Sequence, residues 1–208
     1  MTKDRLHILI DCDGPIFDIH RVWHDKFRHV TPDKTLYMND IDWNTWIDYV
    51  GKERFYGEFL KKSIVRKAPF THDAVKFIRK LQKLPVDITI VSYITEDIRP
   101  ARTARLREKF PDLPIDYETP RYHMRDADIL IDDRWLFISR FATIGRDRLA
   151  LVWTAPWNVD YRCIVHPEDG PRIFPNTYQM IYERNNKIKF TWGWADIYNI
   201  INDKLYKE

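Results

Sequence analysis

The chain has 208 residues, of which 44% are hydrophobic and 14% aromatic, enough to bury one core without a division into independent domains. Its 34 basic and 31 acidic residues leave a formal net charge of only +3, and basic residues are concentrated only at 99–107. This small charge argues against duplex nucleic acid as a partner, and we interpret the basic run as the solvated face of a helix.

The N-terminus has no apolar segment of the kind that signal peptides carry, and no apolar run approaches the roughly 18 residues needed to span a membrane. Only two cysteines occur, Cys12 and Cys163, a usage that favours free thiols over a disulfide. We therefore expect a cytoplasmic protein that does not bind membranes. The sequence leaves a homodimer open.

Four short apolar runs predict strands that are buried on both faces of a sheet; they lie at residues 6–10, 86–91, 127–131 and 149–153. Apolar residues at helical spacing predict helices at 72–81 and 99–110, and residues 192–197 open a C-terminal helix. Because strands alternate with helices, the sequence predicts an α/β fold with a mainly parallel sheet.

Two segments differ from this pattern. Residues 20–66 are rich in aromatic side chains and contain no convincing buried strand, so we expect a small helical insertion there. Residues 162–189 contain three prolines and are expected to be irregular.

Carboxylates follow two of the predicted strands. Asp11 and Asp13 leave the first strand, Asp132 and Asp133 leave the third, and the second ends at the hydroxyl of Ser92. Ligands bind at the carboxyl ends of parallel strands, so these groups are expected to converge. Such crowded carboxylates raise one another's pKa values unless a cation lies among them, and oxygen ligands with open positions suit Mg²⁺.

This arrangement indicates a magnesium-dependent phosphate site. A tight turn, which Gly14 permits, would bring Asp11 and Asp13 close together. Asp11 could then attack phosphorus and form an aspartyl-phosphate, while Asp13 transfers protons. A lone Asp-x-Asp after a strand is often only a turn or a helix cap, but the matching Asp132-Asp133 pair favours the site interpretation.

These motifs resemble those of the haloacid dehalogenase superfamily of phosphohydrolases: an apolar strand and then Asp-x-Asp-Gly, a strand ending in Ser or Thr, and a strand ending in Asp-Asp. Within it, the chain resembles the 5'(3')-deoxyribonucleotidases, which also carry a further Asp near the position of Asp18. Residues 127–134, 154–158 and 192–197 add to the likeness, whereas residues 21–70 resemble the family only weakly.

The resemblance implies a Rossmann-like core at 1–18 and 68–208, with a helical cap at 19–67 inserted after the first strand. It implies that Asp11 is the nucleophile and Asp13 the general acid and base. It further implies that Asp11, the backbone carbonyl of Asp13, and Asp132 hold Mg²⁺, and that Ser92 and backbone amides, including that of Tyr93, bind phosphate.

The chain departs from the family at three places. The family carries a Lys or Arg shortly before the Asp-Asp strand, where this chain has Tyr122; Arg121 is our first candidate for that cation and Arg125 our second. Tyr93 replaces a small hydroxyl residue and narrows the pocket. Residues 63–65, Ser-Ile-Val, stand where relatives carry aromatic residues that stack on the base.

From these features we predict a Mg²⁺-dependent phosphomonoesterase that dephosphorylates small-molecule nucleoside monophosphates, most of all deoxyribonucleotides. Two alternatives stay open. One keeps the chemistry and takes another small phosphoester or a polynucleotide end, and the other is a non-catalytic nucleotide-binding protein on the same scaffold.

Overall fold

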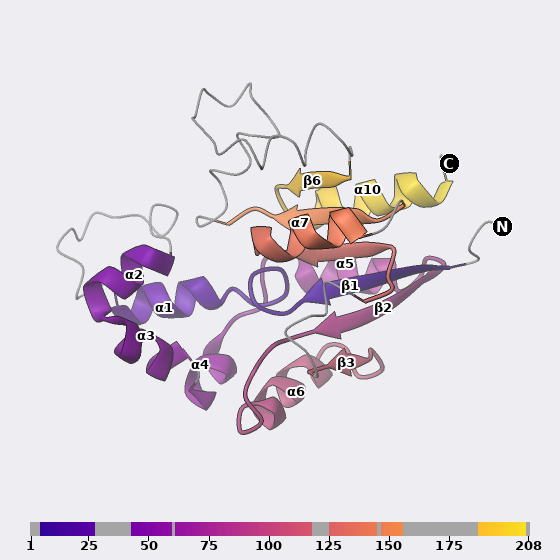
Figure 1. The fold of residues 1–208 in the computed structure, drawn as a ribbon. Coiled ribbons are helices and arrows are strands. Elements are labelled where there is room, and N and C mark those ends of the chain that lie inside the picture. The colour runs from indigo at the N-terminus through magenta and orange to yellow at the C-terminus, as the bar shows by residue number, and fades with distance from the viewer. Residues whose placement is uncertain are drawn as a thin grey trace, which may run out of the picture.

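The computed structural model describes residues 5–27, 43–59, 61–117, 125–144, 147–155 and 187–206. These residues contain a six-stranded sheet of order β3-β2-β1-β4-β5-β6, in which every pair of neighbouring strands is parallel (Figure 1). Its strands are β1 (Leu6–Asp11), β2 (Val86–Val91), β3 (Ile115–Asp116), β4 (Ile129–Asp132), β5 (Leu149–Trp153) and β6 (Ile188–Thr191). The predicted Rossmann-like α/β fold is confirmed.

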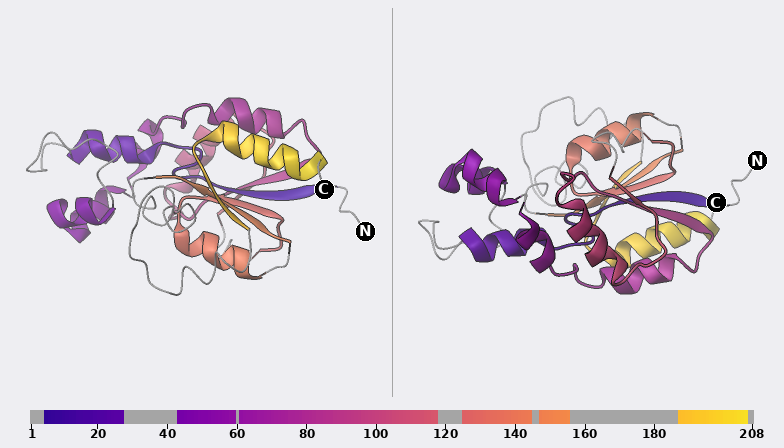
Figure 2. Two further views of the ribbon diagram at one scale, coloured as in Figure 1. Left: turned by 90° about the horizontal axis from the view of Figure 1, so that it is seen from above. Right: turned by 90° about the horizontal axis from the view of Figure 1, so that it is seen from below.

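Helices cover both faces of this sheet. One layer contains α5 (Ala74–Leu81), α6 (Arg99–Arg107) and α10 (Trp194–Tyr206), and the other contains α7 (Trp135–Ile144) (Figure 2). Side chains of β1 alternate between the layers: Ile8 and Ile10 pack with the first, and Leu9 packs with the second. Coverage on both faces explains why the central strands are nearly continuous apolar runs.

The remaining helices lie beyond the carboxyl end of β1 (Figure 1). They are α1 (Ile19–Phe27), α2 (Trp43–Val50), α3 (Lys52–Phe59) and α4 (Lys62–Lys67). An apolar cluster of their own, separate from the clusters on the sheet, includes Trp23, Phe27, Phe55 and Ile64. These elements fall within residues 19–67, for which the sequence predicts a helical insertion, while the exact limits of a cap stay a prediction.

Two strands of the sheet, β3 and β6, are not among the four that the sequence predicts. The edge strand β3 has only two residues, too few for a recognisable apolar run. The other edge strand, β6, shows that the irregular structure expected through residue 189 is wrong at Ile188 and Lys189. Residues 162–186 lie outside the described part of the chain.

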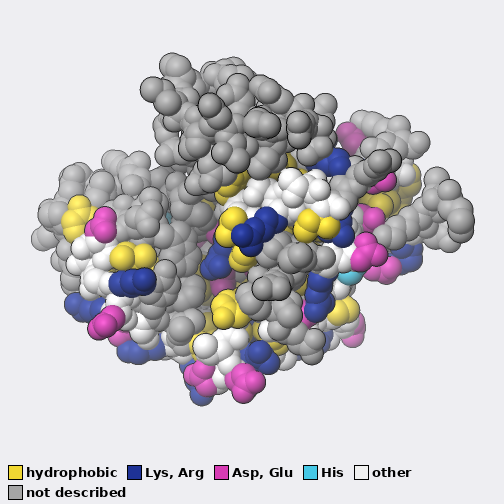
Figure 3. Space-filling view, viewed as in Figure 1, with side chains coloured by type: hydrophobic (Ala, Val, Ile, Leu, Met, Phe, Trp, Pro, Cys, Tyr) yellow, Lys and Arg dark blue, Asp and Glu magenta, His cyan; other side chains and the backbone are white. Residues whose placement is uncertain are grey.

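Basic and acidic side chains are interspersed among the described residues on the face seen in Figure 3. Within the described ranges, none of the helices combines the length and the apolar character that a membrane-spanning segment needs.

Candidate active site

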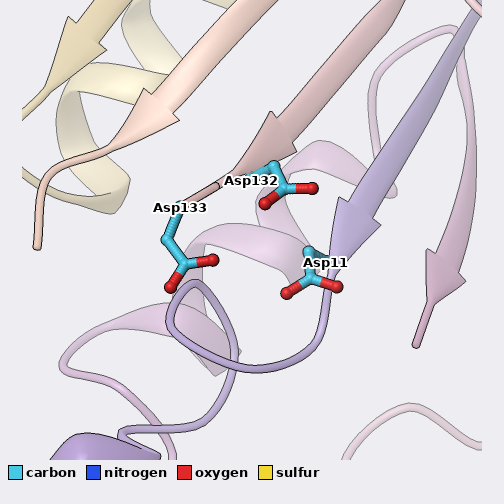
Figure 4. A group of neighbouring side chains, drawn as sticks. All are labelled: Asp11, Asp132 and Asp133. Atoms are coloured by element: carbon cyan, nitrogen blue, oxygen red, sulfur yellow. The ribbon is translucent and has the colours of Figure 1, made fainter. Parts of the chain in front are cut away.

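Three strands bring the predicted site residues to one edge of the sheet. Asp11 is the last residue of β1 and pairs in register with Val91, the last residue of β2, which Ser92 follows directly. Asp132 ends the neighbouring strand β4, and Asp133 comes next. Figure 4 shows the carboxylates of Asp11, Asp132 and Asp133 gathered at these strand ends, beside the loop that follows β1.

These three carboxylates form a buried cluster. One oxygen from each lies within 4.8 Å of the others, and the residues are 8%, 0% and 4% exposed, in the order Asp11, Asp132 and Asp133. Asp133 was expected among the converging carboxylates but not among the metal ligands. The structure places its carboxylate in the same cluster as the two predicted carboxylate ligands.

The cluster is electrostatically unfavourable without a cation. Burial raises the pKa of Asp11 well above its usual value, and the charges of Asp132, Asp133 and Asp13 raise it further. Burial and the charge of Asp132 likewise raise the pKa of Asp133, while the nearby Arg134 opposes both shifts. A hard divalent cation would remove this repulsion and accept all three oxygens, so the donor set fits Mg²⁺.

Backbone hydrogen bonds shape the loop between β1 and α1. The amide of Asp13 donates to Asp11 Oδ2 at 3.1 Å, and that of Phe17 donates to the carbonyl of Cys12 at 2.9 Å. Gly14 has a φ of +103°, a left-handed conformation that other residues rarely adopt. The turn predicted from Gly14 is therefore present.

Side chains from two other elements hold this loop in place. Thr71 Oγ1 donates to the carbonyl of Gly14 at 2.8 Å, and Trp194 Nε1 donates to the carbonyl of Pro15, also at 2.8 Å. Because both acceptors lie within four residues of Asp11, the start of α10 and the segment before α5 position the candidate nucleophile.

The carboxylate of Asp13 lies beside the cluster rather than within it. Its Oδ1 accepts a hydrogen bond of 2.6 Å from Nη2 of Arg102, an α6 residue that is only 1% exposed. This contact corrects the interpretation of residues 99–107 as a solvated face, which is wrong for Arg102. Burial acts to lower the pKa of Arg102, but the charge and hydrogen bond of Asp13 outweigh it and raise that pKa, so the guanidinium stays charged.

The neighbouring polar groups differ in exposure. Ser92 is 3% exposed, and its Oγ has no hydrogen-bond partner among the described residues, whereas the adjacent Tyr93 is 60% exposed. Cys12 is a buried free thiol, and burial raises its pKa far above the usual value. A thiol held protonated in this way is a poor nucleophile, so Asp11 remains the candidate.

The resemblance implies a basic residue near the phosphate, for which Arg121 and Arg125 are the two candidates. Arg121 lies outside the described residues. Arg125 forms an ion pair with Asp116, at the end of the edge strand β3, and β2 separates that strand from β1. Asp18 has a structural role, because its Oδ1 accepts a hydrogen bond from the amide of Arg21 and caps the start of α1.

Comparison of the sequence with protein-family models found no match, and comparison with curated proteins found none either. Comparison of structures did find similar folds. A haloacid dehalogenase-like hydrolase from Burkholderia xenovorans has a TM-score of 0.59 at 13% identity, with 98% of this chain and 99% of that chain covered.

Two further solved structures are similar over nearly their whole length. An L-2-haloacid dehalogenase from Xanthobacter autotrophicus, with chloropropionic acid covalently bound, has a TM-score of 0.56 at 10% identity, covering 95% of this chain and 98% of that one. A HAD-hydrolase from Bacillus subtilis bound to magnesium has a TM-score of 0.51 at 15% identity, covering 96% and 100%. The chain therefore has the haloacid dehalogenase-like fold.

Proposed function

We propose that the protein is a Mg²⁺-dependent phosphomonoesterase that acts on nucleoside monophosphates through an aspartyl-phosphate on Asp11. The observation that carries this proposal is the buried cluster of Asp11, Asp132 and Asp133, with Asp13 held beside it. The cluster supplies a nucleophile and cation ligands, and Asp13 supplies a separate group for proton transfer.

In the first half-reaction, a carboxylate oxygen of Asp11 forms a bond to phosphorus while the bond from phosphorus to the leaving oxygen breaks. Asp13 gives its proton to that leaving oxygen. In the second half-reaction, water attacks phosphorus while Asp13 takes a proton from the water. The bond between phosphorus and the Asp11 oxygen breaks, which releases inorganic phosphate and regenerates the Asp11 carboxylate. Ser92 and the amide of Tyr93 would hold the phosphate oxygens.

Asp11, Asp132, Asp133 and the backbone carbonyl of Asp13 are the groups that would hold the metal ion. When bound, Mg²⁺ would neutralise the charge that accumulates between the phosphate and these carboxylates. Arg121 remains our candidate for a second cation at the phosphate.

Two features favour a phosphoester over an organic halide as the substrate. Displacement of a halide from carbon releases a stable anion, so it needs neither a proton donor for the leaving group nor a divalent cation. An alkyl phosphate needs both, because an alkoxide is a poor leaving group and the phosphate is itself anionic. The site offers an acid residue, Asp13, and a carboxylate cluster suited to a cation.

A cavity of about 600 Å³ between α1 and α4 is a candidate site for the rest of the substrate. Its lining contains three cations, Arg21, Lys26 and Lys67, against one acid, Asp25, together with the apolar Val22 and Ile64. Lys26 is also ion-paired with Glu58, so Arg21 and Lys67 are the cations that favour an anionic ligand. The cavity adjoins the loop after β1, because Pro69 lines it and accepts a hydrogen bond from the amide of Asp18 at 2.9 Å. An anionic, partly apolar molecule such as a nucleotide suits this lining, as do other small phosphoesters.

The test is phosphate release from 5'- and 3'-phosphorylated deoxyribonucleosides and ribonucleosides, with non-nucleotide phosphoesters and a haloacid in the same panel. Wild-type protein is compared in Mg²⁺ and in chelator with Asp11→Asn, whose amide oxygen can still accept the hydrogen bond from Asp13. Asp128→Asn is the matched control, because Asp128 lies at the opposite end of β4 and pairs with the amide of His7.

We expect Mg²⁺-dependent release from nucleoside monophosphates, lost in Asp11→Asn and kept in Asp128→Asn. Release from other phosphoesters alone would correct the substrate class and keep the chemistry. Halide release, or turnover that survives Asp11→Asn, would contradict the proposed reaction. Nucleotide binding without any turnover would favour the non-catalytic alternative.

A further inference from the structure

Arg102 is an unusual residue for the interior of this fold. Its guanidinium is 1% exposed, and Nη2 donates to Asp13 Oδ1 at 2.6 Å. The guanidinium carbon lies 4.9 Å from the centre of the Phe17 ring. The side chain therefore reaches from α6, in the layer that also contains α5 and α10, to the loop that directly follows the candidate nucleophile.

This arrangement is costly for folding. Nε and Nη1 of Arg102 are buried and have no hydrogen-bond partner among the described residues, so Asp13 is the one carboxylate there that pairs with this cation. Desolvating a guanidinium with unpaired N–H groups costs more than one ion pair returns, and an apolar side chain of similar length would fill the space more favourably. The presence of Arg102 therefore calls for a role beyond packing.

The ion pair has a direct consequence for Asp13. The Asp13 side chain is partly exposed, at 22%, while its Oδ1 is tied to a buried partner. Oδ2 then remains as the oxygen that can exchange a proton. A general acid acts efficiently only when its proton is held at the right place relative to the leaving oxygen.

We propose that Arg102 is a positioning residue, which fixes Asp13 through Oδ1 so that Oδ2 exchanges the proton with the leaving group. This inference rests on the proposed phosphomonoesterase function. Arg102 touches no substrate in this proposal, and its effect passes entirely through Asp13.

The chain supplies a matched control on the same helix. Arg105 also lies over the Phe17 ring, at 5.9 Å, and it donates to the carbonyl of Ala68 at 3.1 Å and pairs with Glu108. It makes no hydrogen bond to Asp13 among the described contacts. The variants Arg102→Met and Arg105→Met therefore each remove one cation from Phe17, but only the first releases Asp13.

The readout compares two leaving groups. The nucleoside of a deoxyribonucleoside 5'-phosphate must leave as a strongly basic alkoxide unless it is protonated. The nitrophenol of p-nitrophenyl phosphate leaves as a stabilised phenolate that needs no proton. Rapid-mixing measurement of the first turnover isolates the step in which the leaving group departs. A general acid typically contributes 10²–10⁴-fold, so we expect Arg102→Met to slow nucleoside release about 10²-fold and nitrophenol release less than about threefold.

A double-mutant cycle tests whether Arg102 acts through Asp13. In an Asp13→Asn background, Arg102→Met should cause no further loss on the nucleotide, because the group that Arg102 positions is already disabled. Calorimetric Mg²⁺ titration, which needs no turnover, should show affinity that is not weakened, since removal of a cation cannot weaken binding of another cation through charge. Weakened Mg²⁺ binding would indicate that the site itself has been distorted, and would contradict a role confined to Asp13.

Equal losses on both substrates, additive losses in the cycle, or the same pattern in Arg105→Met would overturn the positioning role. If Arg102→Met does not fold, Arg102→Lys carries the test, since an ammonium group can pair with Oδ1 without the planar fork of the guanidinium. It should then show a smaller loss with the same dependence on the leaving group. A wild-type protein that hydrolyses neither ester would refute the proposed function itself, whereas an active wild type with an unaffected Arg102→Met would refute only this inference.

Discussion

The Asp133 carboxylate lies 3.0 Å from the position that a Cβ atom would occupy on Gly14. The loop after β1 therefore packs directly against the end of β4, and the closeness depends on the absence of a side chain. Gly14 also has a φ of +103°, so the residue satisfies a steric and a conformational requirement together.

Gly14→Ala should impair the site more than it impairs the fold. The new methyl group must displace the Asp133 carboxylate, and the left-handed backbone adds strain of roughly 1–3 kcal/mol. We expect lower thermal stability and a higher Mg²⁺ requirement for turnover. Gly51→Ala is the matched control, because Gly51 has a φ of +84° and nothing within 4 Å of its Cβ position. It should lose stability while keeping its Mg²⁺ requirement, and equal Mg²⁺ effects in both variants would refute the steric argument.

Asp132→Asn should stabilise the metal-free protein and weaken its response to Mg²⁺. The charge of Asp132 raises the pKa values of both Asp11 and Asp133, so its removal relieves repulsion in the cluster. The amide oxygen can still accept the 2.7 Å hydrogen bond that the Arg134 amide donates to Asp132 Oδ1. Thermal unfolding in chelator should give a higher Tm than wild type.

Mg²⁺ titration of the same variant provides the second half of that test. Loss of one anionic ligand should raise the Mg²⁺ concentration needed for half-maximal stabilisation by about tenfold or more. Asp128→Asn, at the other end of β4, should leave unchanged both the Tm in chelator and the Mg²⁺ concentration needed for half-maximal stabilisation. A wild-type Mg²⁺ response in Asp132→Asn would remove Asp132 from the metal site.

The sheet and the carboxylates were predictable from the sequence for a common reason. Strands buried on both faces are mostly apolar, so β1, β2, β4 and β5 stand out from the polar residues that end them. Asp11 and Asp132 were then located by their position after those strands. The edge strands β3 and β6 gave no such signal, because β3 is only two residues long and the four residues of β6 follow a segment whose three prolines indicated irregular structure.

Arg102 was missed because a run of charges in a helix is ordinarily solvated, and its partner lies 89 residues earlier in the chain. A signal was nevertheless present. Ile98, Arg102 and Leu106 are spaced by four residues and share one helical face, and all three are buried. A charged residue in the apolar stripe of a helix indicates a buried partner, although the spacing does not say which acid it meets.

Trp194→Phe should destabilise the loop that carries the nucleophile. The indole Nε1 donates to the carbonyl of Pro15 in a fully buried bond, and phenylalanine would leave that carbonyl unpaired at a cost of about 1–3 kcal/mol. We expect a lower Tm together with reduced turnover, because Pro15 lies four residues after Asp11. Trp192→Phe is the control, since Trp192 is 71% exposed and its backbone hydrogen bond to Asp196 survives the change. Full activity in Trp194→Phe would show that the loop keeps its conformation without this bond.

Glu58 should make the packing of α3 against α1 dependent on pH. Hydrogen bonds from Lys26 of α1 and from Lys61 lower the pKa of Glu58 below its usual value of 4.5. A lowered folded-state pKa means that the ion pairs contribute stability above about pH 4.5, and that this contribution is lost as the pH falls through the folded-state pKa. Because the side chain is 21% exposed, we expect Glu58→Gln to cost only about 0.5–1 kcal/mol near pH 7.

Thermal unfolding at several pH values should show this difference in stability between wild type and Glu58→Gln shrinking toward zero below the folded-state pKa. Glu53→Gln, an exposed change on the same helix, should show no such convergence. A difference between wild type and Glu58→Gln that persists unchanged to low pH would mean that the carboxylate acts through packing rather than through its charge.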